Sequence, residues 1–160
     1  MICQLSEEPA LAKVVWELYG TGEQYPESFF KQYHNVDVRG EYRSLAQYRE
    51  ALSRLDAVVL LSTHNEGMPL SLIEAMASGV PWIATDRGGT RELLHSEACG
   101  GIIPKDATFS EICSCVRQFV EKISQNRTSR RVQRAAYEDC FAPCAIGELW
   151  LSALVGGAPR

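Results

Sequence analysis

Two glutamates bracket a short loop and the start of an expected helix. Glu66 stands directly before Gly67, and Glu74 follows after seven intervening residues, inside a segment that begins at Pro69. The first amides of a helix lack intrahelical partners and attract phosphate, and a glycine lets such a ligand approach the backbone. Because carboxylates repel phosphate, the glutamates are better suited to accept hydrogen bonds from sugar or ribose hydroxyls. The pattern therefore predicts a site for a nucleotide sugar.

The segments around this loop alternate between strand-like and helix-like patterns. A continuous apolar run ends just before the loop, and such runs suit a parallel sheet covered on both faces. Pro69 and Gly79 mark clean ends for the helix between them. We expect strands at 14–19, 36–39, 57–61, 80–85 and 101–104, and helices at 26–33, 45–55, 69–78, 90–94 and 109–123. This order predicts a three-layer α/β/α Rossmann-like parallel sheet that binds ligands at the carboxyl ends of its strands.

The chain divides into one expected domain and a tail. Its 160 residues suffice for a domain with its own core, which we place at 1–123. The tail, 124–160, opens with a polar, basic stretch to 134 that suits a linker or a solvated helix. Its apolar part, 145–155, should dock on another surface. The arginines of this stretch are better explained as a solvated face than as a contact with anionic lipid. They are Arg127, Arg130, Arg131 and Arg134.

Composition excludes several classes of function. The net charge of −4 gives no reason to expect nucleic-acid binding. The six cysteines lack the spacing of a zinc site and favour reduced thiols in a cytoplasmic protein. We find no signal peptide and no apolar run long enough to span a membrane.

The segment from Leu60 to Leu94 resembles a known family. The stretch 66–75, with its two glutamates, is similar to the signature of retaining glycosyltransferases with the GT-B fold, group 1 (family four). Further similarity lies at 79–81, 84–86, 88–89 and Glu92, and more loosely at 19–22, 38–40 and 56–58. The resemblance covers roughly 14–123. It implies the carboxyl-terminal, donor-binding half of a GT-B enzyme.

The resemblance also implies roles for individual residues. Glu66 would be the catalytic residue beside the anomeric carbon, and Glu74 would hold the ribose hydroxyls. Transfer would retain configuration by front-face substitution, with no cofactor and no obligatory metal, as amides stabilise the leaving diphosphate. The donor would be a nucleotide-diphosphate hexose, and the acceptor a glycan or lipid. The remaining donor-binding residues would be Gly67, Met68, Pro69, Leu70, Ser71 and, near the nucleobase, Tyr42.

The start of the chain departs from the family pattern. The family's donor domain opens with a strand and a long helix that supply an arginine and a lysine to the diphosphate. Here 1–8 only faintly echoes that strand, and Gln4 and Glu8 replace the cations. Each lost charge-assisted hydrogen bond would weaken binding by about 1.5–3 kcal/mol. We therefore expect a fold truncated at its amino end, a sheet without its central strand, and a missing acceptor domain or separate subunit.

Other interpretations remain open. A non-catalytic module that binds a nucleotide sugar or a protein partner would suit Gln4 and Glu8, and a related epimerase lacks identifiable acid–base residues. His64 is better read as a loop residue than as an acid or base. A plain turn is favoured at 20–22, where a dinucleotide fingerprint lacks its third glycine. Gly88 and Gly89 form either a tight turn or a close approach to a ligand.

Overall fold

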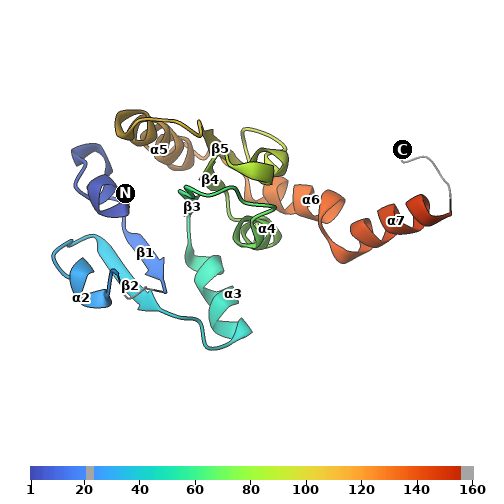
Figure 1. Cartoon of the computed structure of the whole chain (residues 1–160), viewed down its shortest axis with the longest axis horizontal. Helices are drawn as coiled ribbons and strands as arrows, with labels where there is room; N and C mark the ends of the chain where they lie inside the picture. Colours follow the sequence, from blue (N-terminus) through green and yellow to red (C-terminus); the bar gives the residue numbers. More distant parts are fainter. Residues whose placement is uncertain (21–23, 156–160) are drawn as a thin grey trace.

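The computed structural model describes residues 1–20 and 24–155, so the rest of the turn expected at 20–22 lies outside the described residues. Strands and helices alternate along it, as the sequence predicts (Figure 1). Its strands are β1 (Trp16–Tyr19), β2 (Val36–Gly40), β3 (Val58–Leu60), β4 (Trp82–Thr85) and β5 (Gly100–Ile103). Its α-helices are α1 (Ile2–Ser6), α2 (Glu27–Phe30), α3 (Leu45–Arg54), α4 (Leu70–Ala77), α5 (Phe109–Ser124), α6 (Arg130–Cys140) and α7 (Pro143–Leu154), and 3-10 turns form η1 (Pro9–Leu11) and η2 (Gly88–Leu93).

All pairing between the described strands is parallel, but it forms two sheets. One sheet contains β1 and β2, and the other has the order β3-β4-β5. The expectation of a sheet that lacks its central member fits this division. The similarity of 1–8 to an opening strand was misleading. Ile2–Ser6 is helical, and Leu5 is fully buried. An amphipathic turn that buries one leucine is more favourable here than an unpaired strand.

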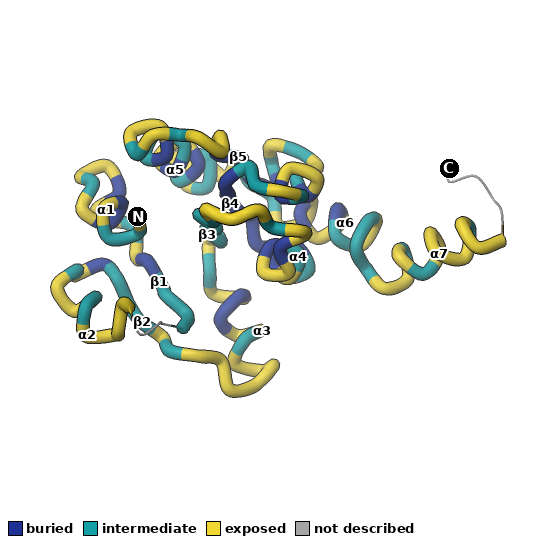
Figure 2. Tube along the Cα trace, viewed as in Figure 1, coloured by how far each residue is buried: buried dark blue, intermediate teal, exposed yellow. Residues whose placement is uncertain are grey.

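Two apolar clusters cover the opposite faces of the larger sheet. Strand side chains point alternately to the two faces, so Trp82 and Ala84 join a cluster with α3, α4 and α6. Ile83 joins the other cluster, with α1, β1 and α5. Every residue of β4 is buried, and Figure 2 shows buried residues gathered on β4, α4 and α5. This confirms the layered α/β architecture.

Helix ends match several sequence signals. Thr108 caps α5 in a capping box with Glu111. Ser44 caps α3 by accepting a hydrogen bond from the Gln47 amide. Gly79, which follows the C-cap residue Ser78 of α4, has a positive φ of 69°, a conformation that favours glycine.

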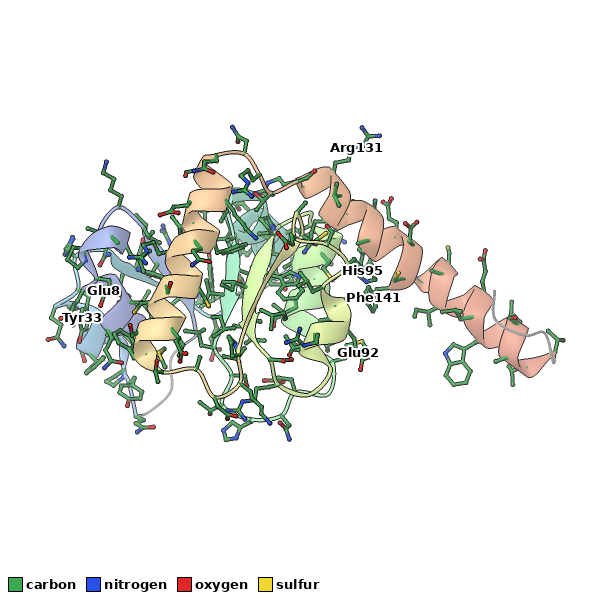
Figure 3. All side chains as sticks on the ribbon, turned by 90° about the horizontal axis from the view of Figure 1, so that it is seen from above. Glu8, Tyr33, Glu92, His95, Arg131 and Phe141 are labelled. Carbon is green, nitrogen blue, oxygen red and sulfur yellow. The ribbon has the colours of Figure 1, made fainter. Side chains whose placement is uncertain are left out.

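The basic stretch was expected to be a linker or a solvated helix, and residues 130–134 begin the helix α6, mostly exposed. Gln133 on α6 is fully buried and donates to the Val80 carbonyl at 3.2 Å, while Arg130 and Arg134 donate to the Leu55 and Ala77 carbonyls. The basic stretch therefore packs on α4 in part. His95 lies edge-on to Phe141 where α6 ends, with ring centroids 5.8 Å apart, and beyond it α7 projects away from the body (Figure 3).

No residue of α7 is buried, so 145–155 docks on no surface of the described chain. Trp150 and Leu151 are each 65% exposed. No helix in the described part of the chain combines the length and the hydropathy needed to cross a membrane.

Candidate functional site

The loop between β3 and α4 is fixed by side-chain hydrogen bonds at its start. Thr85, the last residue of β4, donates to the Ser62 carbonyl at 2.7 Å. The Ser62 hydroxyl in turn donates to Glu66 Oε1 at 2.6 Å. Glu66 is half-buried, and its carboxylate retains acceptor capacity.

Gly88 and Gly89 support the same loop from behind. The Gly89 amide donates to the carbonyls of Glu66, at 3.1 Å, and Gly67, at 3.0 Å. A Cβ on Gly88 would lie 1.7 Å from the Glu66 carbonyl oxygen, and one on Gly89 would lie 2.2 Å from that of Gly67. The glycine pair therefore allows one backbone to pack on another, a role that neither sequence interpretation proposed.

The start of α4 is open. Pro69 is its N-cap rather than its first helical residue, and no side chain caps it. A Cβ on Gly67 would meet no atom within 4 Å, and the side chains of Met68 and Leu70 are 42% and 72% exposed. Hydrogen bonds to the Pro69 carbonyl begin with the amide of Leu72. Among the described residues, the earlier amides of this turn are therefore left to bind a ligand.

Glu74 lies at the end of a chain of aromatic residues. Its carboxylate accepts a short hydrogen bond from the Tyr48 hydroxyl of α3. Tyr48 meets Tyr42 edge-on, with centroids 4.7 Å apart, and Tyr42 stacks on Tyr19 at 4.6 Å. Burial, followed by the hydrogen bond to Glu74, raises the pKa of Tyr48 well above its usual 10, so its hydroxyl stays protonated and donates.

A second cluster surrounds Glu17 on β1. Glu17 accepts hydrogen bonds from Tyr19 at 2.5 Å and from Arg39 at 2.8 Å. Burial alone would raise the pKa of Glu17, but these bonds and the charges of Arg39 and Arg54 outweigh it and lower the pKa. Burial and the bond to Glu17 raise the pKa of Tyr19 to about 12. Beside this cluster lies a cavity of about 540 Å³, lined in part by Tyr19, Arg39, Tyr42, Arg43 and Arg54.

The structure brings some of the predicted site residues together. Ser71, Glu74 and Tyr42 line one cavity of about 1260 Å³. Glu66, Gly67, Met68, Pro69 and Leu70 lie on the adjoining loop and helix start, outside the lining of that cavity. Sequence reasoning missed Tyr48 and Tyr19, which position Glu74 and Tyr42. No local pattern indicates the role of Tyr48, because its partner Glu74 lies 26 positions away in the sequence.

Parallel strands with helices on both faces, and a helix α4 whose first amides are open, make this chain an α/β protein of layered architecture. Its residues 2–122 match the family model described as "Glycosyl transferases group 1". Since this is most of the chain, the protein belongs to that family of transferases.

Similar proteins are longer than this chain. A protein of Thermosipho melanesiensis described as a "Probable sucrose-phosphate synthase" is 28% identical over 98 residues, which cover 61% of this chain and 23% of that protein. The lipopolysaccharide outer core galactosyltransferase WaaB, solved without ligand, superposes with a TM-score of 0.73 and 16% identity, over 97% of this chain and 44% of its own. Anabaena HepE, solved with UDP, superposes with a TM-score of 0.71 and 21% identity. The match covers 97% of this chain and 43% of that protein. These structures share the fold, and the chain spans less than half of each.

Proposed function

We propose that this chain is the donor-binding part of a retaining glycosyltransferase, which transfers a hexose from a nucleotide-diphosphate sugar to a glycan or lipid acceptor. One observation carries the proposal. The uncapped start of α4 presents free amides, and one turn later Glu74 faces a cavity beside stacked aromatic rings. Support also comes from Anabaena HepE, a protein of the same fold that was solved with UDP-glucose.

Each group has a place in the proposed reaction. The amides around Gly67, Met68 and Leu70, with Ser71, would bind the diphosphate and stabilise the charge that it gains as it leaves. Glu74 would accept hydrogen bonds from the ribose, and Tyr42 would lie beside the base. Glu66 would contact sugar hydroxyls near the anomeric carbon.

The proposed transfer uses no cofactor and no obligatory metal. In front-face substitution the departing diphosphate accepts the proton of the acceptor hydroxyl, so no other base is needed. The protein's amides would stabilise the negative charge of the leaving diphosphate, a role that a metal ion often plays. Activity that survives a chelator supports this, and activity restored only by a divalent cation contradicts it. The acceptor would be bound by an amino-terminal domain or a separate subunit, which would also exclude water from the cleft.

A glycine substitution tests the donor site without disturbing the fold. In Gly67→Ala the added methyl meets no protein atom within 4 Å, so stability should not change, but it blocks the approach of a diphosphate. We expect UDP-glucose affinity in calorimetry to fall about tenfold or more, a loss of about 1.4 kcal/mol. Gly147→Ala, equally open but on α7, is the matched control. Equal affinities in the two variants, or no binding of UDP- or GDP-sugars by the wild type, would refute the donor site.

One observation favours a second function, a non-catalytic binding module. The described residues that line the larger cavity include two cations, Lys13 and Arg54, against three carboxylates, Glu17, Asp56 and Glu74. With so few cations nearby, the charge that develops on a departing diphosphate at the adjoining start of α4 would be poorly stabilised, which favours binding without transfer. Donor binding without hydrolysis or transfer, even after an acceptor domain is supplied, would favour the module over the enzyme.

A further inference from the structure

A smaller cavity lies beside the aromatic residues that link the two sheets. Its volume is about 540 Å³, which is within the usual range for a small-molecule pocket. It shares Tyr19, Tyr42 and Arg54 with the lining of the larger cavity, where Glu74 lies. A ligand held at Glu74 can therefore extend past these rings into the smaller cavity.

A loop and a helix form most of the wall of the smaller cavity. The loop after β2 supplies residues 40–43, and one face of α3 supplies side chains from Gln47 to Arg54. Gly40 has a positive φ of 74°, and a Cβ there would meet no atom within 4 Å. The backbone of the loop is therefore open to a ligand.

Two of the cations at this cavity already have partners. Arg39 forms ion pairs with Glu17 and Asp37, and Arg54 lies 4.0 Å from Glu17. Neither of these carboxylates lines the smaller cavity. The charges of Arg39 and Arg54 are thus balanced from outside it.

Three other charged side chains line the same cavity without such a partner. None of the ion pairs between described residues includes Arg43, Glu41 or Glu50. One guanidinium and two carboxylates are therefore left to meet a ligand. The carboxylates would repel a phosphate, whereas a neutral group with both donors and acceptors would suit all three side chains.

Arg43 and Glu50 stand at opposite ends of this wall. Arg43 precedes the N-cap Ser44, and Glu50 lies about two helical turns further on, a separation of about 10 Å. A planar ring between them would present one edge to a guanidinium and the other edge to a carboxylate. Tyr19 and Tyr42, stacked at 4.6 Å, form the aromatic side of the same space.

Guanine has the hydrogen-bonding groups that this pair of side chains needs. Its O6 and N7 are adjacent acceptors, which suit the fork of an arginine, and its N1–H and N2–H₂ are adjacent donors, which suit a carboxylate. Uracil offers a carboxylate only one N–H, and in adenine a donor stands beside N7 and would face the guanidinium. Of these three bases, guanine alone satisfies both side chains.

We propose that the smaller cavity selects guanine, with Arg43 donating to O6 and N7 and Glu50 accepting from N1–H and N2–H₂. The proposal rests on the donor site proposed above, in which Glu74 holds the ribose. It makes a GDP-sugar the preferred donor, while UDP-sugars still bind more weakly. Arg43 and Glu50 were not among the donor-binding residues expected from the sequence.

Calorimetry on the whole chain with three nucleotides tests the selection. The probes are GDP, UDP and inosine diphosphate, which lacks only the N2 amino group of GDP and so removes one of the two donors to Glu50. We expect GDP to bind at least about tenfold more tightly than UDP, with inosine diphosphate between the two. Equal binding of GDP and inosine diphosphate would overturn the role of Glu50.

A matched pair of variants tests Glu50 directly. Glu50→Gln keeps the size of the side chain, but it replaces one acceptor oxygen with a donor that faces the donors of guanine. The preference for GDP over UDP should therefore fall about tenfold, toward equal affinities. Glu27→Gln, exposed on α2 and outside the cavity, should keep the preference of the wild type.

The results separate failure of guanine selection from failure of the donor site. If neither GDP nor UDP binds the wild type, the donor site is refuted and guanine selection with it. If both bind equally, or if the preference persists in Glu50→Gln, the donor site stands and guanine selection is refuted. If circular dichroism shows that Glu50→Gln does not fold, the comparison of GDP with inosine diphosphate in the wild type decides.

Discussion

The two sheets hold their parts of the candidate site in different ways. Around β3-β4-β5, the loop that carries Glu66 is fixed by backbone contacts with Gly88 and Gly89 and by the Thr85 hydroxyl. Around β1-β2, Tyr42 is held by ring contacts with Tyr19 and Tyr48. The proposed diphosphate side of the site therefore depends on close backbone packing, and the proposed base side depends on side-chain contacts between the sheets.

Burial explains this difference. All four residues of β4 are buried, because helices cover both faces of that strand. No residue of β2 is buried, and Trp16 is the only buried residue of β1. A fully covered strand fixes the loops at its end, whereas a half-exposed strand leaves them to local interactions.

The largest expected effect comes from breaking the backbone packing in the larger sheet. Gly88 has a positive φ of 57°, and a Cβ there would lie 1.7 Å from the Glu66 carbonyl oxygen. Gly88→Ala should therefore lower the free energy of unfolding by about 3 kcal/mol. Urea denaturation measures this loss.

Gly101→Ala is the matched control for that substitution. A Cβ on Gly101, in β5, would make only ordinary contacts with Ile83 at 3.5 and 3.6 Å. Its stability should change by less than about 1 kcal/mol. Equal stability of the two variants would mean that the Glu66 loop is not held by the glycine pair.

The sequence predicted the regions where local signals decide the structure. Pro69 and Gly79 marked the ends of α4 within one residue, and the expected helix at 109–123 agrees with α5 within one residue. The membership of strands in a sheet depends on contacts between distant segments, so local patterns did not indicate the division into two sheets. That division was expected only from the resemblance, through the missing opening strand.

The same limit applies to single residues and to the tail. The bond between Tyr48 and Glu74 joins two helices, and neither helix pattern indicates it. The composition of 145–155 is apolar enough to predict docking, but composition does not identify a surface to dock on, and α7 has none within the described chain.

A smaller effect on stability is expected from the hydrogen bond between Tyr48 of α3 and Glu74 of α4. Tyr48→Phe removes the hydrogen bond from α3 to Glu74 on α4, and Glu74→Gln removes its charge. Because both groups are partly exposed, each variant should lose about 1 kcal/mol or less of unfolding free energy. A double-mutant cycle should give a coupling of about 0.5–1 kcal/mol. Additive losses would show that this contact does not hold the proposed ribose side in place.

The smallest effect concerns charge on β1 and should depend on pH. The pKa of Glu17 is lowered in the folded state, so its contribution to stability is present above the unfolded pKa, near 4.5, and disappears as pH falls through the folded value. Glu17→Gln should therefore cost about 0.5–1 kcal/mol at pH 7 and progressively less below pH 4.5. Thermal unfolding of both proteins across this range measures the difference, and Glu50→Gln, on the same half of the molecule, controls for the general loss of one charge. A difference that stays constant from pH 7 to 3 would show that the Tyr19 and Arg39 bonds do not stabilise the charged carboxylate, and that the smaller sheet is held by packing as the larger one is.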